Sequence, residues 1–126
     1  MAVVTKISPL APKAFPDLPV ITGVRFATAA AGVRYQGRTD IMLAVADAGS
    51  SVAGVFTKSA TRAAPVLDCQ DKIGKPSDAG VAILVNSGNA NAFTGKFGRA
   101  SVEAITSAVA YSTNMPVERV FTSSTG

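Results

Sequence analysis

Residues 86–95 constrain the fold of this chain more strongly than any other stretch. They include three Asn and two Gly but no charged residue, and they follow the apolar run 81–85, which predicts a buried strand. Asn and Gly adopt left-handed backbone conformations at low cost, and Asn also hydrogen-bonds nearby backbone groups. An ordinary turn needs only one or two such residues. The segment therefore predicts a chain that folds back sharply after the strand; an elaborate strand-to-helix loop is the simpler alternative.

Composition predicts one globular domain with a core of small side chains. The chain has 126 residues, 48% of them hydrophobic, whereas aromatic residues make up 6% and Trp is absent. That length supports a single domain with its own core, and this apolar content excludes a disordered chain.

Charge and cysteine content narrow the classes of partner. Lys and Arg exceed Asp and Glu by 12 to 8 without forming a basic run, so we expect no nucleic-acid partner. No apolar stretch approaches the about 18 residues of a membrane helix, and no signal peptide is evident, so we expect no membrane association. A single cysteine, Cys69, excludes an internal disulfide and fits the cytoplasm; we expect it to pack as a small apolar residue.

Several kinds of active site are excluded by missing residues. The chain has no His, so it cannot build a Ser-His or Cys-His dyad or a His-ligated metal site. No carboxylates are paired at metal-ligand spacing. Gly95-Lys96 is followed by Phe97, and position 90 is Ala, so both the P-loop and the dinucleotide-binding pattern fail. We therefore expect no metal and no bound nucleotide cofactor.

Hydrophobic periodicity and turn residues predict a mixed α/β layout. Four prolines define an extended arm over residues 1–19, followed by the domain 20–126. Apolar or alternating runs predict strands, the run 40–46 being buried on both faces, and 3.6-residue periodicity predicts helices. The predicted strands are 24–29, 32–35, 40–46, 51–57, 81–85 and 120–122, and the helices are 64–72 and 99–114, the second with a stripe of Val102, Ile105, Ala108, Val109 and Ser112. This order is not an alternating doubly wound sheet.

The last four residues, 123–126, carry three hydroxyls and a glycine directly after a predicted strand. Backbone amides at such a strand end can point into open space, where fixed donors stabilise a developing oxyanion. Thr125 and Gly126 are therefore candidate catalytic residues, with an exposed polar turn as the alternative. Because the chain stops on this strand, we expect it to be a fragment of a longer protein.

Three motifs in this order carry a family resemblance: Val52-Ala53-Gly54-Val55-Phe56-Thr57 with Ala63-Ala64-Pro65-Val66, then Val85-Asn86-Ser87-Gly88-Asn89-Ala90-Asn91-Ala92, then Ser124-Thr125-Gly126. From about Gly23 onward the chain resembles the N-terminal part of the α chain of the arginine-biosynthesis ornithine acetyltransferase family, also called glutamate N-acetyltransferase.

This resemblance implies a fold and an activity. The fold would be a layered mixed-sheet α/β sandwich of the aminopeptidase/ornithine acetyltransferase type, incomplete in this fragment. Members cut themselves between an Ala and a Thr, and the β-chain Thr, assisted by its own α-amino group, moves acetyl from N-acetylornithine to glutamate. Thr125 and Gly126 match the family's oxyanion hole.

The resemblance also implies partners that this chain lacks. The nucleophile, the cleavage site and the substrate-binding residues would lie in the remainder of the α chain and in the β chain, within a heterotetramer. Acetyl-CoA would be a co-substrate of bifunctional members, and no other cofactor is implied. The fragment alone would be inactive.

Two alternatives remain at this level. One is a fragment of a related self-cleaving aminopeptidase with the same sandwich, which the Val-Phe-Thr and Asn-Ser-Gly-Asn motifs disfavour. The other is a non-catalytic module that only binds a ligand or partner.

Overall fold

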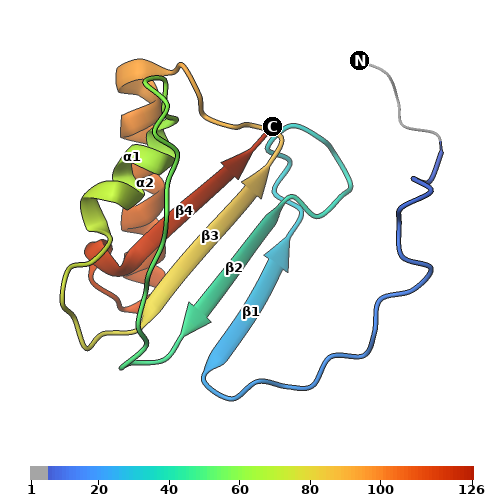
Figure 1. Ribbon diagram of the computed structural model, residues 1–126, viewed down its shortest axis with the longest axis horizontal. Coiled ribbons are helices and arrows are strands. Elements are labelled where there is room, and N and C mark those ends of the chain that lie inside the picture. Colours follow the sequence, from blue (N-terminus) through green and yellow to red (C-terminus); the bar gives the residue numbers. More distant parts are fainter. Residues whose placement is uncertain (1–5) are drawn as a thin grey trace.

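The computed structural model of the protein describes residues 6–126, and these form one mixed sheet with two α-helices (Figure 1). The sheet order is β1-β2-β3-β4, with β1, β2 and β3 antiparallel and β4 parallel to β3. The elements are β1 (Val24–Ala29), β2 (Ile41–Ala46), α1 (Ala64–Lys72), β3 (Val81–Ser87), α2 (Gly95–Thr113), the 3₁₀ turn η1 (Val117–Arg119) and β4 (Val120–Thr125). The predicted mixed α/β class is confirmed.

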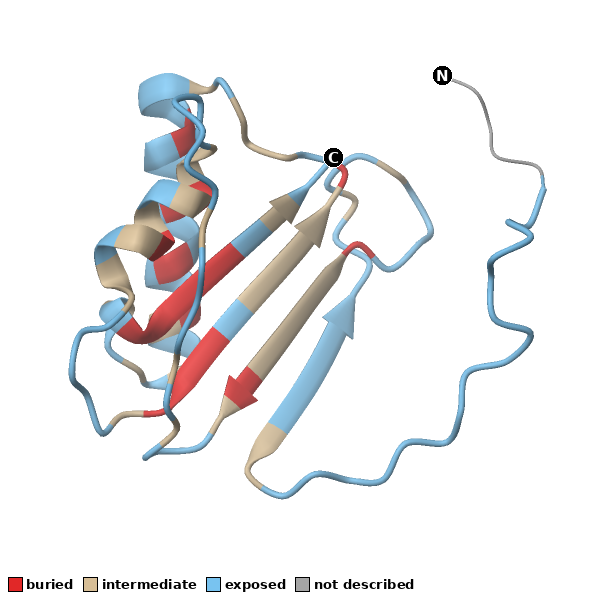
Figure 2. Cartoon of the chain, viewed as in Figure 1, coloured by how far each residue is buried: buried red, intermediate tan, exposed pale blue. Residues whose placement is uncertain are grey.

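The core lies where β3 and β4 meet the helices, as the buried residues in Figure 2 show. On one face of the sheet, Ala82 and Val120 pack with Val109 of α2. On the other face, Val81 and Phe121 pack with Cys69 of α1. Strand β1, at the far edge of the sheet, is almost entirely exposed.

Helix α1 has the predicted bounds for local reasons. Pro65 lies in the first turn, where its missing N–H is not needed, and Gly74 follows the helix with a positive φ of 78°. The helix covers the free edge of β4, since Lys72 Nζ and Cys69 Sγ donate to the carbonyls of Val120 and Thr122 at 3.2 and 3.3 Å.

Helix α2 begins at Gly95, four residues before the predicted start. Its buried residues are Gly98, Val102, Thr106 and Val109. Of the predicted stripe, Val102 and Val109 are buried, but Ile105, Ala108 and Ser112 are exposed, so that part of the prediction is wrong. Because the residues on its buried side are small, α2 lies close to the sheet and to the loop that precedes the helix.

Two predicted strands are wrong, and β2 is less buried than predicted. Residues 51–57 form no ladder; Val52 and Phe56 instead pack from an irregular segment against the second core cluster. Residues 32–35 bend because the Asp40 carboxylate takes the N–H groups of Ala31 and Val33. In β2 only Val45 is buried, and the other residues are half-buried. Strands β3 and β4 both extend beyond the predicted 81–85 and 120–122.

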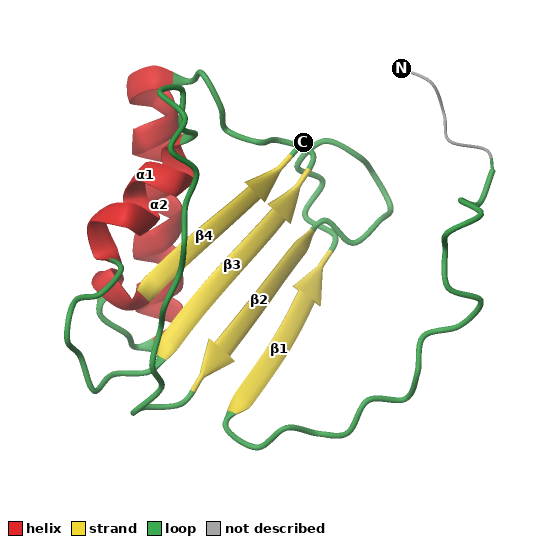
Figure 3. Ribbon diagram, in the orientation of Figure 1, coloured by secondary structure: helices red, strands yellow, loops and turns green. Residues whose placement is uncertain are grey.

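Residues 6–19 form no helix or strand (Figure 3), and all of them are exposed (Figure 2). Residues 1–5 of the predicted arm lie outside the described residues, and the domain boundary at residue 20 stays a prediction. Within residues 6–126, no helix has both the length and the apolar character needed to cross a membrane.

Candidate functional site

Thr125 and Gly126 lie at the C-terminal end of β4, beside the end of β3 (Figure 1). Thr125 pairs with Ser87, which is the last residue of β3, so the ladder stops there. Both Thr125 and Gly126 are exposed. A Cβ on Gly126 would lie 3.6 Å from Ala90 Cβ, which places the loop after β3 directly beside the pair.

Residues 88–94 form a loop that connects β3 to α2, which was the simpler alternative, and left-handed backbone occurs repeatedly in and beside it. Asn91 and Phe93 have φ values of 52° and 58°, and Gly88 and Gly95 have 99° and 55°. At Gly88 the requirement is also steric, because a Cβ there would lie 2.8 Å from Arg34 Cβ. The left-handed backbone of this segment is confirmed.

The asparagine side chains join this loop to its neighbours. Asn86 Oδ1 accepts the hydroxyl hydrogen of Ser124 at 2.7 Å, and its Nδ2 donates to the carbonyl of Asn89 at 3.0 Å. Asn89 Oδ1 accepts the N–H of Asn91 at 2.9 Å. Asn91 Nδ2 in turn donates to the carbonyl of Gly98 in α2 at 3.1 Å.

Asp40 organises a second loop at the same end of the sheet. Its carboxylate accepts the N–H groups of Ala31 and Val33, both at 2.6 Å, and its backbone carbonyl accepts the N–H of Ser87 at 2.9 Å. Burial alone would raise the pKa of this carboxyl, but the hydrogen bonds from the backbone outweigh it and hold the pKa below the ordinary 3.8. Asp40 is 3% exposed, so we assign it a structural role.

A hollow of about 260 Å³ lies at the ends of β3 and β4; Leu84 and Ile105 are among its apolar lining residues, and Asn86 and Ser124 are among its polar ones. Another of about 480 Å³ lies between α1, α2 and the loop before α2; charged side chains of both signs line it, among them Arg62, Asp68, Asp71, Arg99 and Glu103.

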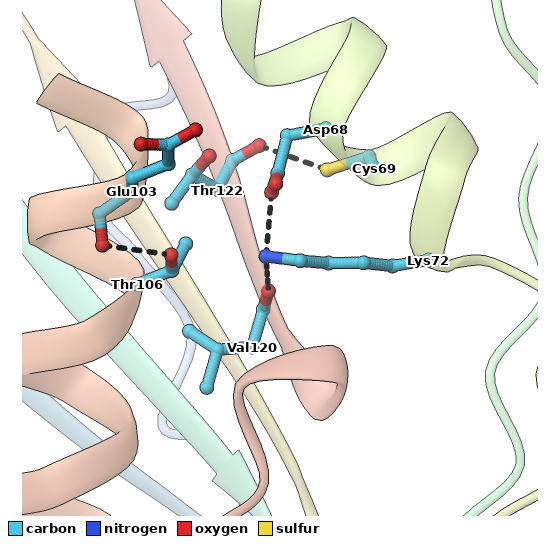
Figure 4. A network of polar contacts seen from close by, with 7 residues as sticks. All are labelled: Asp68, Cys69, Lys72, Glu103, Thr106, Val120 and Thr122. Carbon is cyan, nitrogen blue, oxygen red and sulfur yellow. Dashed lines mark hydrogen bonds and ion pairs between the residues drawn. The ribbon is translucent and has the colours of Figure 1, made fainter. Parts of the chain in front are cut away.

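Cys69 is buried and packs as predicted (Figure 4). Burial raises the pKa of its thiol, which donates to the carbonyl of Thr122 and is therefore not an activated nucleophile. Within residues 6–126, no three His, Cys, Asp or Glu side chains gather to hold a metal ion.

Thr125 and Gly126, the two predicted site residues, are consecutive in the chain. Beside them the structure places a hydrogen bond between Ser124 and Asn86, which sequence reasoning missed. The polar composition of residues 86–95 identified the loop, but nothing in the sequence paired Asn86 with Ser124. The role of Asp40 was missed too; its only signal was an isolated acid before an apolar strand.

Comparison with known proteins relates this chain to one family. The model of the ArgJ family matches residues 25–126. Among curated relatives, the arginine biosynthesis bifunctional protein ArgJ of Ruegeria pomeroyi is 72% identical over 126 residues, which are 100% of this chain and 31% of the relative. The protein of the same name in Nitrobacter winogradskyi is 52% identical over 124 residues, 97% of this chain and 30% of the relative. The chain thus spans under a third of the length of these relatives.

Two solved structures share the fold. The arginine biosynthesis bifunctional protein ArgJ of Bacillus halodurans superposes with a TM-score of 0.74 at 31% identity, covering 83% of this chain and 54% of that one. The ornithine acetyltransferase of Mycobacterium tuberculosis, solved in complex with ornithine, gives a TM-score of 0.69 at 35% identity, covering 83% and 56%.

Proposed function

Because the chain belongs to the ArgJ family, we propose that it is the N-terminal part of an acetyltransferase that moves acetyl from N-acetylornithine to glutamate in arginine biosynthesis. The full-length relatives named for arginine biosynthesis, and the ornithine acetyltransferase with the same fold, support this reading. They also favour it over a self-cleaving aminopeptidase and over a non-catalytic binding module.

The reaction we propose is a two-step acyl transfer through an acetyl-threonine. The hydroxyl oxygen of a β-chain Thr, freed by self-cleavage downstream of this chain, attacks the acetyl carbonyl carbon, and the Thr α-amino group takes the hydroxyl proton. The α-amino group passes this proton to the ornithine nitrogen as the C–N bond breaks, and ornithine leaves as the amine. The amine of glutamate then attacks the ester carbonyl carbon and gives a proton to the Thr α-amino group. That proton passes to the Thr oxygen as the ester C–O bond breaks, which releases N-acetylglutamate and restores the Thr hydroxyl.

Thr125 and Gly126 contribute the oxyanion donors in this proposal. The carbonyls of Val120 and Thr122 face α1, away from β3. Backbone N–H and C=O groups alternate sides along a strand, so continuation of β4 by one residue directs the N–H of Gly126 away from β3 as well. Together with the exposed Thr125 hydroxyl, it is available to the tetrahedral oxygen. This exposed donor pair at the end of a fixed strand is the observation that carries the proposal.

Substitution of Thr125 in the full-length enzyme tests the proposal. Removal of one oxyanion donor lowers kcat by about 10²–10³ in comparable sites, so Thr125→Ala should lose activity on that scale while the subunits still assemble. Ser123→Ala, an exposed neighbour, is the matched control and should retain wild-type kcat. An unchanged kcat for Thr125→Ala would remove Thr125 from the mechanism.

The remaining parts of the proposal concern molecules that this chain does not contain. The remainder of the α chain and the β chain, in a heterotetramer, would supply the nucleophile and the substrate-binding residues. Acetyl-CoA would be a second acetyl donor, which the word bifunctional in the relatives' names supports. We place the full-length enzyme in the cytoplasm, where its Cys69 would remain reduced.

A further inference from the structure

The hydrogen bond between Ser124 and Asn86 is the last side-chain contact before the candidate oxyanion donors. Ser124 Oγ donates to Asn86 Oδ1 at 2.7 Å, and Ser124 directly precedes Thr125. The two residues are also direct partners in the ladder between β3 and β4. The side-chain bond therefore adds a second constraint at the same register position.

Gly126 lies beyond the last residue pair of the ladder between β3 and β4. Strand β3 ends at Ser87, the partner of Thr125, and the positive φ of 99° at Gly88 turns the chain away from the ladder. The ladder thus offers no partner residue opposite Gly126. Any further control over the direction of its N–H comes from the residues just before it.

Asn86 is chemically suited to join this strand end to the loop. Its amide oxygen accepts from Ser124, while its amide nitrogen donates to the carbonyl of Asn89. A carboxylate would lack the donor, and an apolar residue would lack both groups. The Asn86 amide thus connects β4 to the loop, and both its oxygen and its nitrogen have a hydrogen-bond partner.

The loop itself is anchored on α2. Asn89 Oδ1 holds the N–H of Asn91, whose Nδ2 donates to the carbonyl of Gly98 at 3.1 Å. Thr94 donates its hydroxyl hydrogen to Asn91 Oδ1 at 2.6 Å. A continuous set of hydrogen bonds therefore runs from the end of β4 to the first turn of α2.

We propose that Asn86 is a positioning residue for acetyl transfer, which acts through Ser124 to fix the directions of the Thr125 hydroxyl and the Gly126 N–H. The inference rests on the proposed function. Oxyanion donors accelerate a reaction only when they are aimed before charge develops, so loosening the strand end lowers kcat. In this proposal Asn86 acts on Ser124 and not on substrate, so the KM for N-acetylornithine should stay at the wild-type value.

The experiment uses the full-length enzyme and steady-state kinetics with N-acetylornithine and glutamate. Asn86→Ala and Ser124→Ala should each lower kcat by about tenfold, the scale of one lost hydrogen bond, without raising KM for N-acetylornithine. Ser124→Thr keeps the hydroxyl and should retain most of kcat. Ser123→Ala is the control and should match wild type.

A double variant separates positioning through Ser124 from an independent effect of Asn86. If Asn86 acts through Ser124, the variant Asn86→Ala with Ser124→Ala loses no more kcat than the worse single variant. Multiplying losses would overturn the inference, as would a raised KM at unchanged kcat. If Asn86→Ala does not fold, Ser124→Ala against Ser124→Thr still decides it.

Thr125→Ala, measured in parallel, distinguishes the two levels of failure. Loss of kcat in Thr125→Ala with wild-type kcat in both Asn86→Ala and Ser124→Ala overturns only the positioning role. Unchanged kcat in Thr125→Ala overturns the oxyanion site and the positioning role together.

Discussion

The guanidinium of Arg119 donates from Nε to the carbonyl of Gly80 at 3.1 Å, which joins the residue before β4 to the residue before β3. Its Nη2 donates to the carbonyls of Ser50 and Ala79 at 2.6 and 3.2 Å. Arg119 is only 6% exposed. One buried side chain therefore ties together three segments at the end of the sheet opposite the candidate site.

Arg119→Lys should destabilise the full-length protein. An ammonium group cannot reproduce the planar fork of a guanidinium, so buried carbonyls lose their partner, at a cost of about 1–3 kcal/mol. The measurement is the midpoint of thermal unfolding. Arg99→Lys, at an exposed arginine, is the control and should leave the midpoint unchanged. Equal midpoints for the two variants would contradict this role of Arg119.

Asp40→Asn should lower the unfolding midpoint at neutral pH, and this difference from the wild type should disappear in acid. The folded pKa of Asp40 lies below its ordinary 3.8, so its contribution to stability is complete above pH 3.8 and is lost as the pH falls through the folded value. An asparagine directs its N–H₂ group at one of the two backbone N–H groups, and a protonated Asp40 carboxyl does the same with its O–H. Unfolding midpoints of both proteins, measured from pH 7 downward, should converge below pH 3.8. A constant difference across that range would refute the assignment.

Thr122→Val should raise the unfolding midpoint. The hydroxyl of Thr122 is buried and finds no partner among the described residues, whereas that of Thr106, which is also buried, donates to the carbonyl of Glu103 at 3.3 Å (Figure 4). Replacing an unpaired buried hydroxyl with a methyl group removes a desolvation cost of about 1 kcal/mol or more. Thr106→Val is the matched control and should lower the midpoint. If both valines lower it equally, the Thr122 hydroxyl has a partner.

Gly98→Ala should destabilise the start of α2, although alanine is the better helix former. A Cβ at Gly98 would lie 2.5 Å from Asn91 Oδ1 and 2.7 Å from Thr94 Cβ. Overpacking of this kind typically costs about 1–3 kcal/mol, and the anchor of the asparagine loop would shift. The unfolding midpoint reports the cost. An increased midpoint would mean that the loop moves aside freely.

Local sequence patterns were sufficient where local chemistry decides the structure. Pro65 and Gly74 define the ends of α1 from within the helix and its immediate neighbours. The apolar runs of β2 and β3 identify these segments as strands in the same way, although β2 is less buried than its composition predicts. The Asn and Gly residues of 86–95 predicted left-handed backbone because no other residues adopt it as readily.

Three of the wrong predictions involve contacts that hydrophobic periodicity does not report. Residues 32–35 have a strand-like pattern, but Asp40 takes the N–H groups of Ala31 and Val33 beside them. Val52 and Phe56 pack on the core without joining the sheet. Helix α2 starts early because Gly98, a poor helix former in isolation, allows Asn91 to approach.

The sequence alone identified Thr125 and Gly126 as candidate oxyanion donors, from their residue types and their position after a predicted strand. Only the tertiary structure paired Asn86 with Ser124, which lie 38 residues apart. Backbone conformation depends on neighbouring residues, so a linear pattern reveals it. Which side chains meet depends on strand order and register, and these follow from packing the whole sheet.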